Sequence, residues 1–178
     1  MSPSVRDRVS QLDFWSSSVD PVPLDGGITN TNFIVEDQGE RFVVRVGDDI
    51  PIHGVMRFNE IAAARAAHAA GISPEIVYSA DGVFIMRFIE GRTFTEPEVR
   101  REQNLKRIIH LIQACHNELP RHFIGPALVF WPFHVCRNYI QTAKRGGSRM
   151  TDSLPRFLDI NEKLERTVGE IKLVFGHN

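Results

Sequence analysis

The sequence contains little cysteine and no excess of either charge. Its 178 residues include two cysteines, Cys115 and Cys136, which are too few for a disulfide framework. The 21 Lys and Arg residues nearly balance the 22 Asp and Glu residues, so the formal net charge is −1. A general nucleic-acid-binding protein usually carries a basic excess. We therefore expect a reduced, cytoplasmic protein that does not bind nucleic acid.

Long apolar runs are also absent. No uninterrupted stretch approaches the roughly 20 apolar residues that a membrane-spanning helix needs. The first 20 residues are polar and mixed in charge, and they show no secretory signal. Four histidines lack the spacing of a metal-binding motif such as His-Glu-x-x-His; they are His110, His116, His122 and His134. We predict neither membrane insertion nor a metal site.

The first half of the chain predicts a small sheet with one helix. Val5, Val9 and Leu12 share one face of a short helix near the start. Alternating apolar residues and turn signals then predict strands at Thr31–Glu36, Arg41–Val46, Ile76–Tyr78 and Val83–Ile89. Residues 54–70 are rich in alanine, a strong helix former, and Gly71 is placed to end that helix.

The second half predicts mainly helices. Thr95 and Glu98 have the spacing of a capping box, and an apolar face follows from Leu105 to Cys115. Further helices are predicted at Trp131–Lys144 and Phe157–Ile171, with a short strand at Leu173–Phe175. The apolar helix faces indicate exposed hydrophobic surface and hence self-association of the isolated chain.

The segment from Gly26 to Asn32 is the first candidate for chemistry. A Gly pair lets the backbone turn sharply, and successive N–H groups can then point at a phosphate. An ordinary Gly-Gly hairpin turn fits the same residues.

Arg45 and Glu60 are the second candidate. Arg45 lies among apolar strand residues on the same face as Val43, and a cation there needs a partner. Glu60 shares a helix face with small apolar residues and could be that partner. Alternatively, Arg45 extends its head into solvent and Glu60 is a solvated acid favoured by the helix dipole.

The order of these segments resembles the choline/ethanolamine kinase group of the aminoglycoside-phosphotransferase and protein-kinase-like superfamily. The segments that carry the resemblance are Gly26–Phe33, Phe42–Val46, Asn59-Glu60, Ile72–Tyr78, Met86–Gly91 and Gly176–Asn178. It covers about residues 20–178. Arg rather than Lys at position 45 is typical of the choline-type branch, and Arg suits bidentate phosphate contact.

The resemblance implies a protein-kinase-like α+β fold. Residues 1–89 would form a small nucleotide-binding lobe, built as an antiparallel sheet with one long helix. Residues 90–178 would form the hinge and the first helices of an incomplete helical lobe. Gly26, Gly27 and Asn32 would lie over the ATP phosphates, and Arg45 would contact them while Glu60 holds it.

The resemblance also places the base and the start of the catalytic loop. Met86 would lie at the back of the adenine pocket, and the backbone of Arg87 and Ile89 would contact the base. His177 would be the first residue of the His-x-Asp-x-x-x-x-Asn loop. The catalytic Asp of that loop would follow Asn178 and is not in this sequence, so the chain is expected to be truncated before it.

We therefore predict an ATP-dependent phosphotransferase that uses Mg²⁺ in its complete form and acts on a small amino alcohol such as choline or ethanolamine. Two alternatives remain open. One is a non-catalytic nucleotide-binding remnant or partner subunit. The other is a helical interaction protein that binds no nucleotide.

Overall fold

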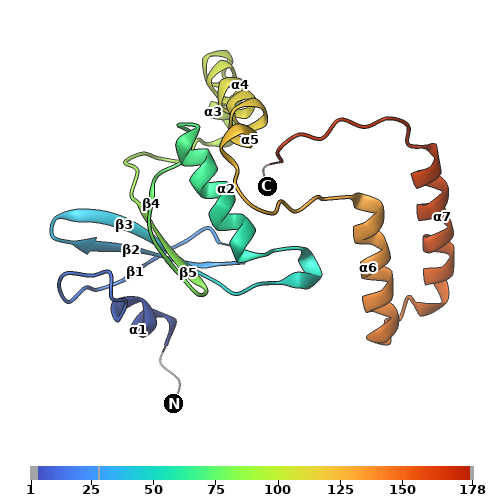
Figure 1. Ribbon diagram of the computed structural model, residues 1–178, viewed down its shortest axis with the longest axis horizontal. Coiled ribbons are helices and arrows are strands. Elements are labelled where there is room, and N and C mark those ends of the chain that lie inside the picture. The colour runs from blue at the N-terminus through green and yellow to red at the C-terminus, as the bar shows by residue number, and fades with distance from the viewer. Residues whose placement is uncertain (1–3, 28, 177–178) are drawn as a thin grey trace. The chain divides into compact units, whose positions relative to one another are not determined.

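Five strands form one antiparallel sheet in a computed structural model that describes residues 4–27 and 29–176 (Figure 1). The strand order across the sheet is β1-β2-β3-β5-β4. The strands are β1 (Val22–Leu24), β2 (Thr31–Asp37), β3 (Glu40–Val46), β4 (Ile76–Ala80) and β5 (Val83–Arg87). The predicted α+β class with a small antiparallel sheet is confirmed, and β1 is an edge strand that we did not predict.

Helices make up most of the remaining regular structure. They are α1 (Val5–Ser10), α2 (Arg57–Ala69), α3 (Glu96–Val99), α4 (Glu102–Asn117), α5 (Leu119–His122), α6 (Pro132–Arg145) and α7 (Leu154–Thr167), with 3₁₀ turns η1 (Pro51–His53) and η2 (Thr151–Ser153). None of the helices in the described ranges combines the length and apolar character of a membrane-spanning segment.

The predicted β2–β3 hairpin and the end of α2 have the expected turn chemistry. Gln38 and Gly39 both have positive φ, 53° and 79°, as a tight hairpin turn requires. After α2, the N–H of Gly71 donates to the His68 carbonyl and the N–H of Ile72 donates to the Ala67 carbonyl, both at 2.9 Å. Gly71 has φ +75°, so it closes the helix as a Schellman motif.

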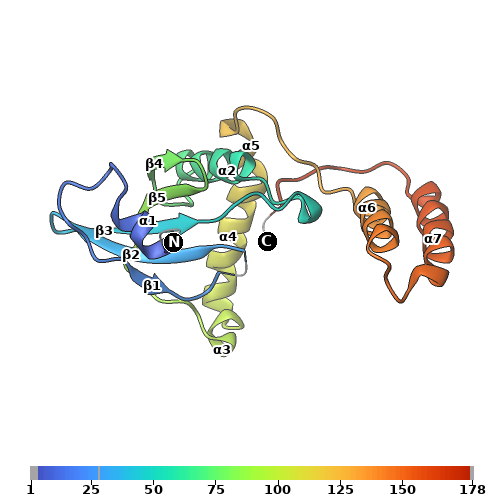
Figure 2. The same cartoon turned by 90° about the horizontal axis from the view of Figure 1, so that it is seen from below.

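One face of the sheet carries the hydrophobic core. Its buried members are Phe33, Val35, Phe42, Val44, Val46, Val83 and Ile85, with Val9 of α1 packed on them. Leu12, Phe14 and Trp15 follow α1 and cover the same cluster. The two ribbon views place α1 and α2 on opposite faces of the sheet (Figures 1 and 2). The N-terminal segment therefore takes one face, and the other face is left to α2.

A buried aspartate fastens the N-terminal segment to the hairpin. Asp37 accepts hydrogen bonds from the Ser17 hydroxyl at 2.6 Å and the Ser16 N–H at 2.8 Å. These two donors hold the pKa of Asp37 below its usual range.

The described chain divides into two compact units. One contains Met1–Asp49, Val55–Gly125 and Val174–Asn178, and therefore the sheet with α1 to α5. The other contains Ile50–Gly54 and Pro126–Leu173, and therefore α6 and α7. The predicted boundary between residues 89 and 90 does not coincide with the division into these units, and the two predicted lobes stay a prediction.

In the second unit a carboxylate joins α6 to α7. Glu165 accepts hydrogen bonds from two nitrogens of Arg137, at 2.5 and 3.1 Å, and from the Trp131 Nε1–H at 2.6 Å. The hydrogen bonds from Arg137, which contribute most, and from Trp131 lower the pKa of Glu165 to about 2.

The helix that we predicted to open at Thr95 is interrupted early. Its capping box between Thr95 and Glu98 is present, and the N–H and the hydroxyl of Thr95 both donate to the Glu98 carboxylate at 2.9 Å. However, α3 ends at Val99 and α4 begins at Glu102. The buried Asn104 donates from Nδ2 to the Glu98 carbonyl at 2.8 Å, which supplies a partner that a continuous helix would have provided.

Two predictions near the end of the chain are wrong. The helix predicted over Phe157–Ile171 ends at Thr167, because Val168 has extended backbone (φ −73°, ψ 120°) and Gly169 follows with low helix propensity. Leu173–Phe175 forms no strand, since no neighbouring strand pairs with it among the described residues. Phe175 instead packs against Phe123, with ring centroids 5.5 Å apart.

Candidate functional site

The α2-facing side of the sheet carries two adjacent rows of side chains. Directly paired residues of antiparallel strands point to the same face. Asn32 pairs with Arg45, and these two form the polar row. Ile34 pairs with Val43 and Val43 pairs with Met86, which makes an apolar row of half-buried side chains. The rows are separated by two residues along each strand, about 7 Å.

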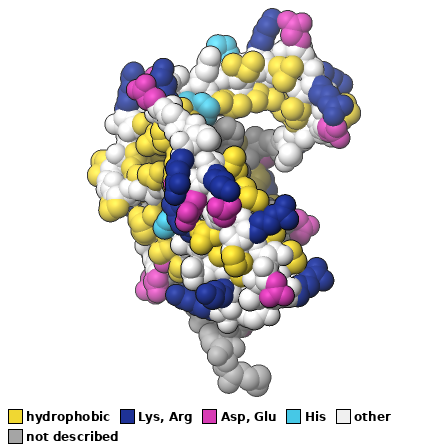
Figure 3. Space-filling model, turned by 90° about the vertical axis from the view of Figure 1, so that its right-hand side faces the viewer, with side chains coloured by type: hydrophobic (Ala, Val, Ile, Leu, Met, Phe, Trp, Pro, Cys, Tyr) yellow, Lys and Arg dark blue, Asp and Glu magenta, His cyan; other side chains and the backbone are white. Residues whose placement is uncertain are grey.

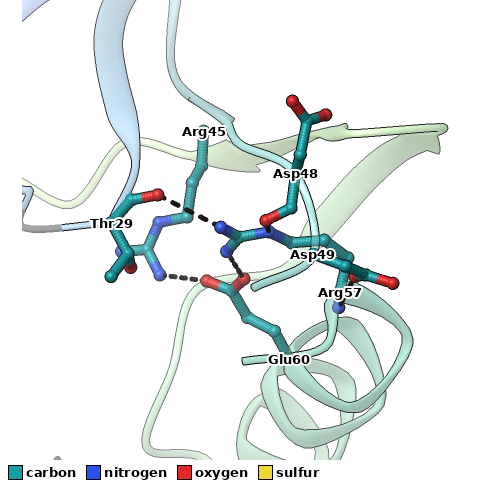
Figure 4. A network of polar contacts seen from close by, with 6 residues as sticks. All are labelled: Thr29, Arg45, Asp48, Asp49, Arg57 and Glu60. Atoms are coloured by element: carbon teal, nitrogen blue, oxygen red, sulfur yellow. Dashed lines mark hydrogen bonds and ion pairs between the residues drawn. The ribbon is translucent and has the colours of Figure 1, made fainter. Parts of the chain in front are cut away.

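The predicted ion pair between Arg45 and Glu60 is present. Nη1 of Arg45 donates to Oε1 of Glu60 at 2.7 Å (Figure 4). The side chains are 35% and 21% exposed, so the pair is partly shielded but still open on the side of Arg45. The Arg45 guanidinium also lies 5.6 Å from the ring centre of Phe84, its neighbour on β5. The role of this pair in phosphate binding stays a prediction.

A second arginine, Arg57, binds the same carboxylate, and sequence reasoning missed it. Its Nη1 pairs with Oε2 of Glu60 one helical turn away, so Glu60 bridges two guanidinium groups. Its Nη2 donates to the carbonyl of Thr29 at 3.1 Å, and its Nε donates to the carbonyl of Asp48 at 2.9 Å (Figure 4). The three-residue spacing from Arg57 to Glu60 was the available signal.

The Gly-rich turn, residues 26–32, leads into the start of β2, at the edge of the sheet where Asn32 and Arg45 lie. Gly26 has φ +110°, which disfavours any side chain there. A Cβ at Gly27 would overlap the carbonyl oxygen of Asn30 and would lie 2.9 Å from Nδ2 of Asn32. Glycine is therefore favoured at both positions, for different reasons: the backbone conformation requires it at Gly26, and the lack of space for a Cβ requires it at Gly27.

Three buried polar atoms at this edge have no hydrogen-bond partner in the part of the chain that the structure describes. They are Oδ1 of Asn30, Oδ1 of Asn32 and Nε of Arg45. Leaving such groups unpaired costs on the order of 1–3 kcal/mol each. Most buried polar groups in proteins are hydrogen-bonded, so these three atoms leave hydrogen-bonding capacity unused at this edge.

The predicted hinge residues lie at the end of β5. Met86 is half-buried in the apolar row, whereas the Arg87 side chain leaves the sheet and pairs with Glu40 at 2.9 Å and Glu75 at 3.1 Å. The hydrogen bonds to these two carboxylates, of which the bond to Glu40 contributes most, raise the pKa of Arg87. Ile89 is 62% exposed, and its N–H donates to no described residue. Base contact by the backbone of Arg87 and Ile89 stays a prediction. His177 lies outside the described residues.

Comparison with known proteins gives a match in structure only. No family model matches the sequence, and no curated protein matches it either. A choline/ethanolamine kinase family protein from Mesorhizobium loti is 24% identical, with a TM-score of 0.53 over 78% of this chain and 44% of that chain. An ethanolamine kinase from Plasmodium vivax is 15% identical, with a TM-score of 0.63 over 90% of this chain and 48% of that chain.

A choline kinase from Cryptosporidium parvum is 16% identical, with a TM-score of 0.60 over 86% of this chain and 46% of that chain. This chain has the fold of choline and ethanolamine kinases. The predicted protein-kinase-like architecture is thereby confirmed at the level of the fold. The chain spans less than half the length of each of these three structures.

Proposed function

We propose that this chain is the nucleotide-binding part of an ATP-dependent phosphotransferase of the choline/ethanolamine kinase family. In its complete form the enzyme would transfer a phosphoryl group from ATP to a small amino alcohol such as choline or ethanolamine. The shared fold supports this proposal, and the observation that carries it is the Arg45–Glu60 ion pair beside the Gly-rich turn. The division into a nucleotide-binding part, 1–89, and a hinge with helices, 90–178, is part of the proposal.

The two rows of side chains suit the two ends of a nucleotide. The apolar row of Ile34, Val43 and Met86 offers a flat hydrophobic surface of the kind that an adenine ring packs against. The polar row offers Arg45, whose side chain is 35% exposed, within one strand spacing of the Gly-rich turn. Arg presents several N–H donors in a plane, which matches the oxygen atoms of phosphate.

The described residues fit ATP but do not by themselves fit Mg²⁺. They contain no group of three His, Cys, Asp or Glu side chains placed to hold a metal ion. Mg²⁺ is therefore proposed for the complete enzyme only, as the ion that neutralises phosphate charge. No step in this part of the chain is assigned to it.

Calorimetric titration with ATP tests the proposal. We expect saturable binding that Arg45→Ala weakens by about tenfold or more, the order expected for losing a hydrogen bond between charged groups. Arg65→Ala is the matched control, because Arg65 lies on α2 and its exposed side chain bonds Ser79 at 3.0 Å, away from Glu60. Equal affinity in the Arg45 and Arg65 variants would contradict the proposal.

A further inference from the structure

Arg57 differs from Arg45 in how its donors are used. The Arg57 side chain is 11% exposed, and Nη1, Nη2 and Nε each donate to a different acceptor: Glu60, Thr29 and Asp48. Arg45 is 35% exposed, and its bond to Glu60 is made from Nη1. Each nitrogen of the Arg57 guanidinium therefore has an acceptor within the protein, whereas the exposed part of the Arg45 guanidinium keeps capacity for a ligand.

The acceptors of Arg57 come from three separate segments. Thr29 belongs to the Gly-rich turn, Asp48 to the loop after β3, and Glu60 to α2 (Figure 4). The start of α2 is held as well, because the backbone N–H of Arg57 donates to Oδ1 of Asp49 at 2.6 Å. Removing this one side chain would release the Gly-rich turn and the loop after β3 from α2, which carries both Arg57 and Glu60.

We propose that Arg57 is the positioning residue of this site. It fixes the Gly-rich turn and the Glu60 carboxylate relative to each other, so that Arg45 and the turn face the same phosphate group. This inference rests on the proposed nucleotide binding for its effect on ATP, whereas the anchoring of the turn stands on the contacts alone. Arg57 itself contacts no ligand in this account.

A lysine cannot replace Arg57 in this role. The guanidinium is a rigid planar fork whose donors reach acceptors in several directions, whereas an ammonium group is a compact point charge on a flexible stem. Arg57→Lys preserves the charge beside Glu60 but cannot also reach the carbonyls of Thr29 and Asp48 in the observed geometry. Charge and anchoring are thereby separated by one substitution.

Gly47 offers a second way to disturb the anchor without removing it. A Cβ at Gly47 would lie 2.6 Å from Nη2 of Arg57 and 2.6 Å from Oδ1 of Asn30. Gly47→Ala should therefore displace the guanidinium from Thr29 while every donor stays in the chain. If it acts through Arg57, it should have little further effect when Arg57 has already been changed.

The decisive experiment compares ATP with adenosine, which shares the base but has no phosphate. We expect Arg57→Lys and Gly47→Ala each to weaken ATP binding by about five- to tenfold, the order of one lost hydrogen bond of ordinary strength, because Arg57 acts on the phosphate site only through its neighbours. Adenosine affinity should be unchanged, which a general loss of folding could not produce. The double variant should bind ATP no more weakly than Arg57→Lys alone.

Hydrogen exchange supplies a readout without nucleotide. In Arg57→Lys the amides of residues 27 and 29–32 should exchange faster, while those of β3 and β5 stay protected. Unchanged exchange in that segment overturns the anchoring, and equal losses of ATP and adenosine affinity overturn the positioning role. If the wild-type chain binds no ATP, the proposed function fails, and the exchange result alone decides whether Arg57 is the anchor.

Discussion

Glu60 is the residue whose neutralisation should reveal most about the site. It is 21% exposed and each of its oxygens accepts from a different arginine. Glu60→Gln keeps the shape but leaves one carbonyl oxygen and one NH₂ group, so one arginine must face a donor. Because Arg57 is less exposed than Arg45, we expect Arg57 to keep the oxygen and Arg45 to lose its partner.

The magnitude follows from this geometry. Losing one hydrogen bond between charged groups costs about 1.5–3 kcal/mol, and the partial exposure of Arg45 favours the lower end. For a chain of this size, each kcal/mol lowers the melting temperature by roughly 2–4 °C. ATP affinity should fall as well, because Arg45 is no longer held at the polar row.

Fluorescence can confine the measurement to the relevant unit. Trp15 lies in the unit that contains Glu60 and Trp131 lies in the other, so a Trp131→Phe background reports on the first unit. Glu102→Gln is the matched control, because Glu102 pairs with Lys106 in the open, where both side chains are at least 70% exposed. Such pairs contribute about 0–1 kcal/mol. A loss in Glu60→Gln no larger than in Glu102→Gln would refute the bridging role.

Three further outcomes follow from the structure. The unit of α6 and α7 should lose stability as pH falls from about 4.5 toward 2, because the native pKa of Glu165 lies below its ordinary value of 4.5. In Glu165→Gln, thermal unfolding followed by circular dichroism should show a smaller loss of stability over the same pH range. Gly27→Ala should weaken ATP binding in calorimetry, since its Cβ would overlap the Asn30 carbonyl, whereas Gly169→Ala, with open space around it, should not. The proposed function predicts that these 178 residues by themselves give no phosphorylated choline or ethanolamine by mass spectrometry, because the Asp that the resemblance would place after Asn178 is not among them; turnover that disappears in Arg45→Ala would contradict this.

Self-association also stays a prediction. Apolar side chains lie open among charged ones in the space-filling view (Figure 3). Exposed examples on α4 are Leu105, Ile109 and Leu111, at 41%, 51% and 54%. Large exposed apolar patches favour association. Light scattering over a wide concentration range should show dimers or larger species, and a uniform monomer would count against it.

The parts of the site that follow from periodicity could be predicted from the sequence. Alternation along β3 placed Arg45 on one face with Val43, and helical spacing placed Glu60 on a face of α2 lined with small side chains. Each charge needed a partner, and the other charge could supply it. The turn at Gln38 and Gly39 and the end of α2 at Gly71 likewise depend on local chemistry.

The remaining parts depend on contacts that leave no pattern in the sequence. Arg57 binds the carbonyls of Thr29 and Asp48, and a backbone acceptor has no signature of its own. Strand β1 is three residues long and contains Pro23, which is tolerated at a sheet edge but weakens any strand pattern. The apolar row was missed because Ile34 and Met86 meet Val43 only through the strand register.

A methionine methyl group provides the most direct test of the central claim that this sheet face binds a nucleotide. The chain has four methionines, so a ¹³C-methyl spectrum is simple to assign by substitution. On titration with ATP we predict a saturable shift of the Met86 methyl resonance, caused by the adenine ring above the apolar row. The resonance of Met150, which is 44% exposed and follows α6, should not move. In Arg45→Ala the same Met86 shift should require a higher ATP concentration. A Met86 resonance that does not respond to ATP would contradict the account.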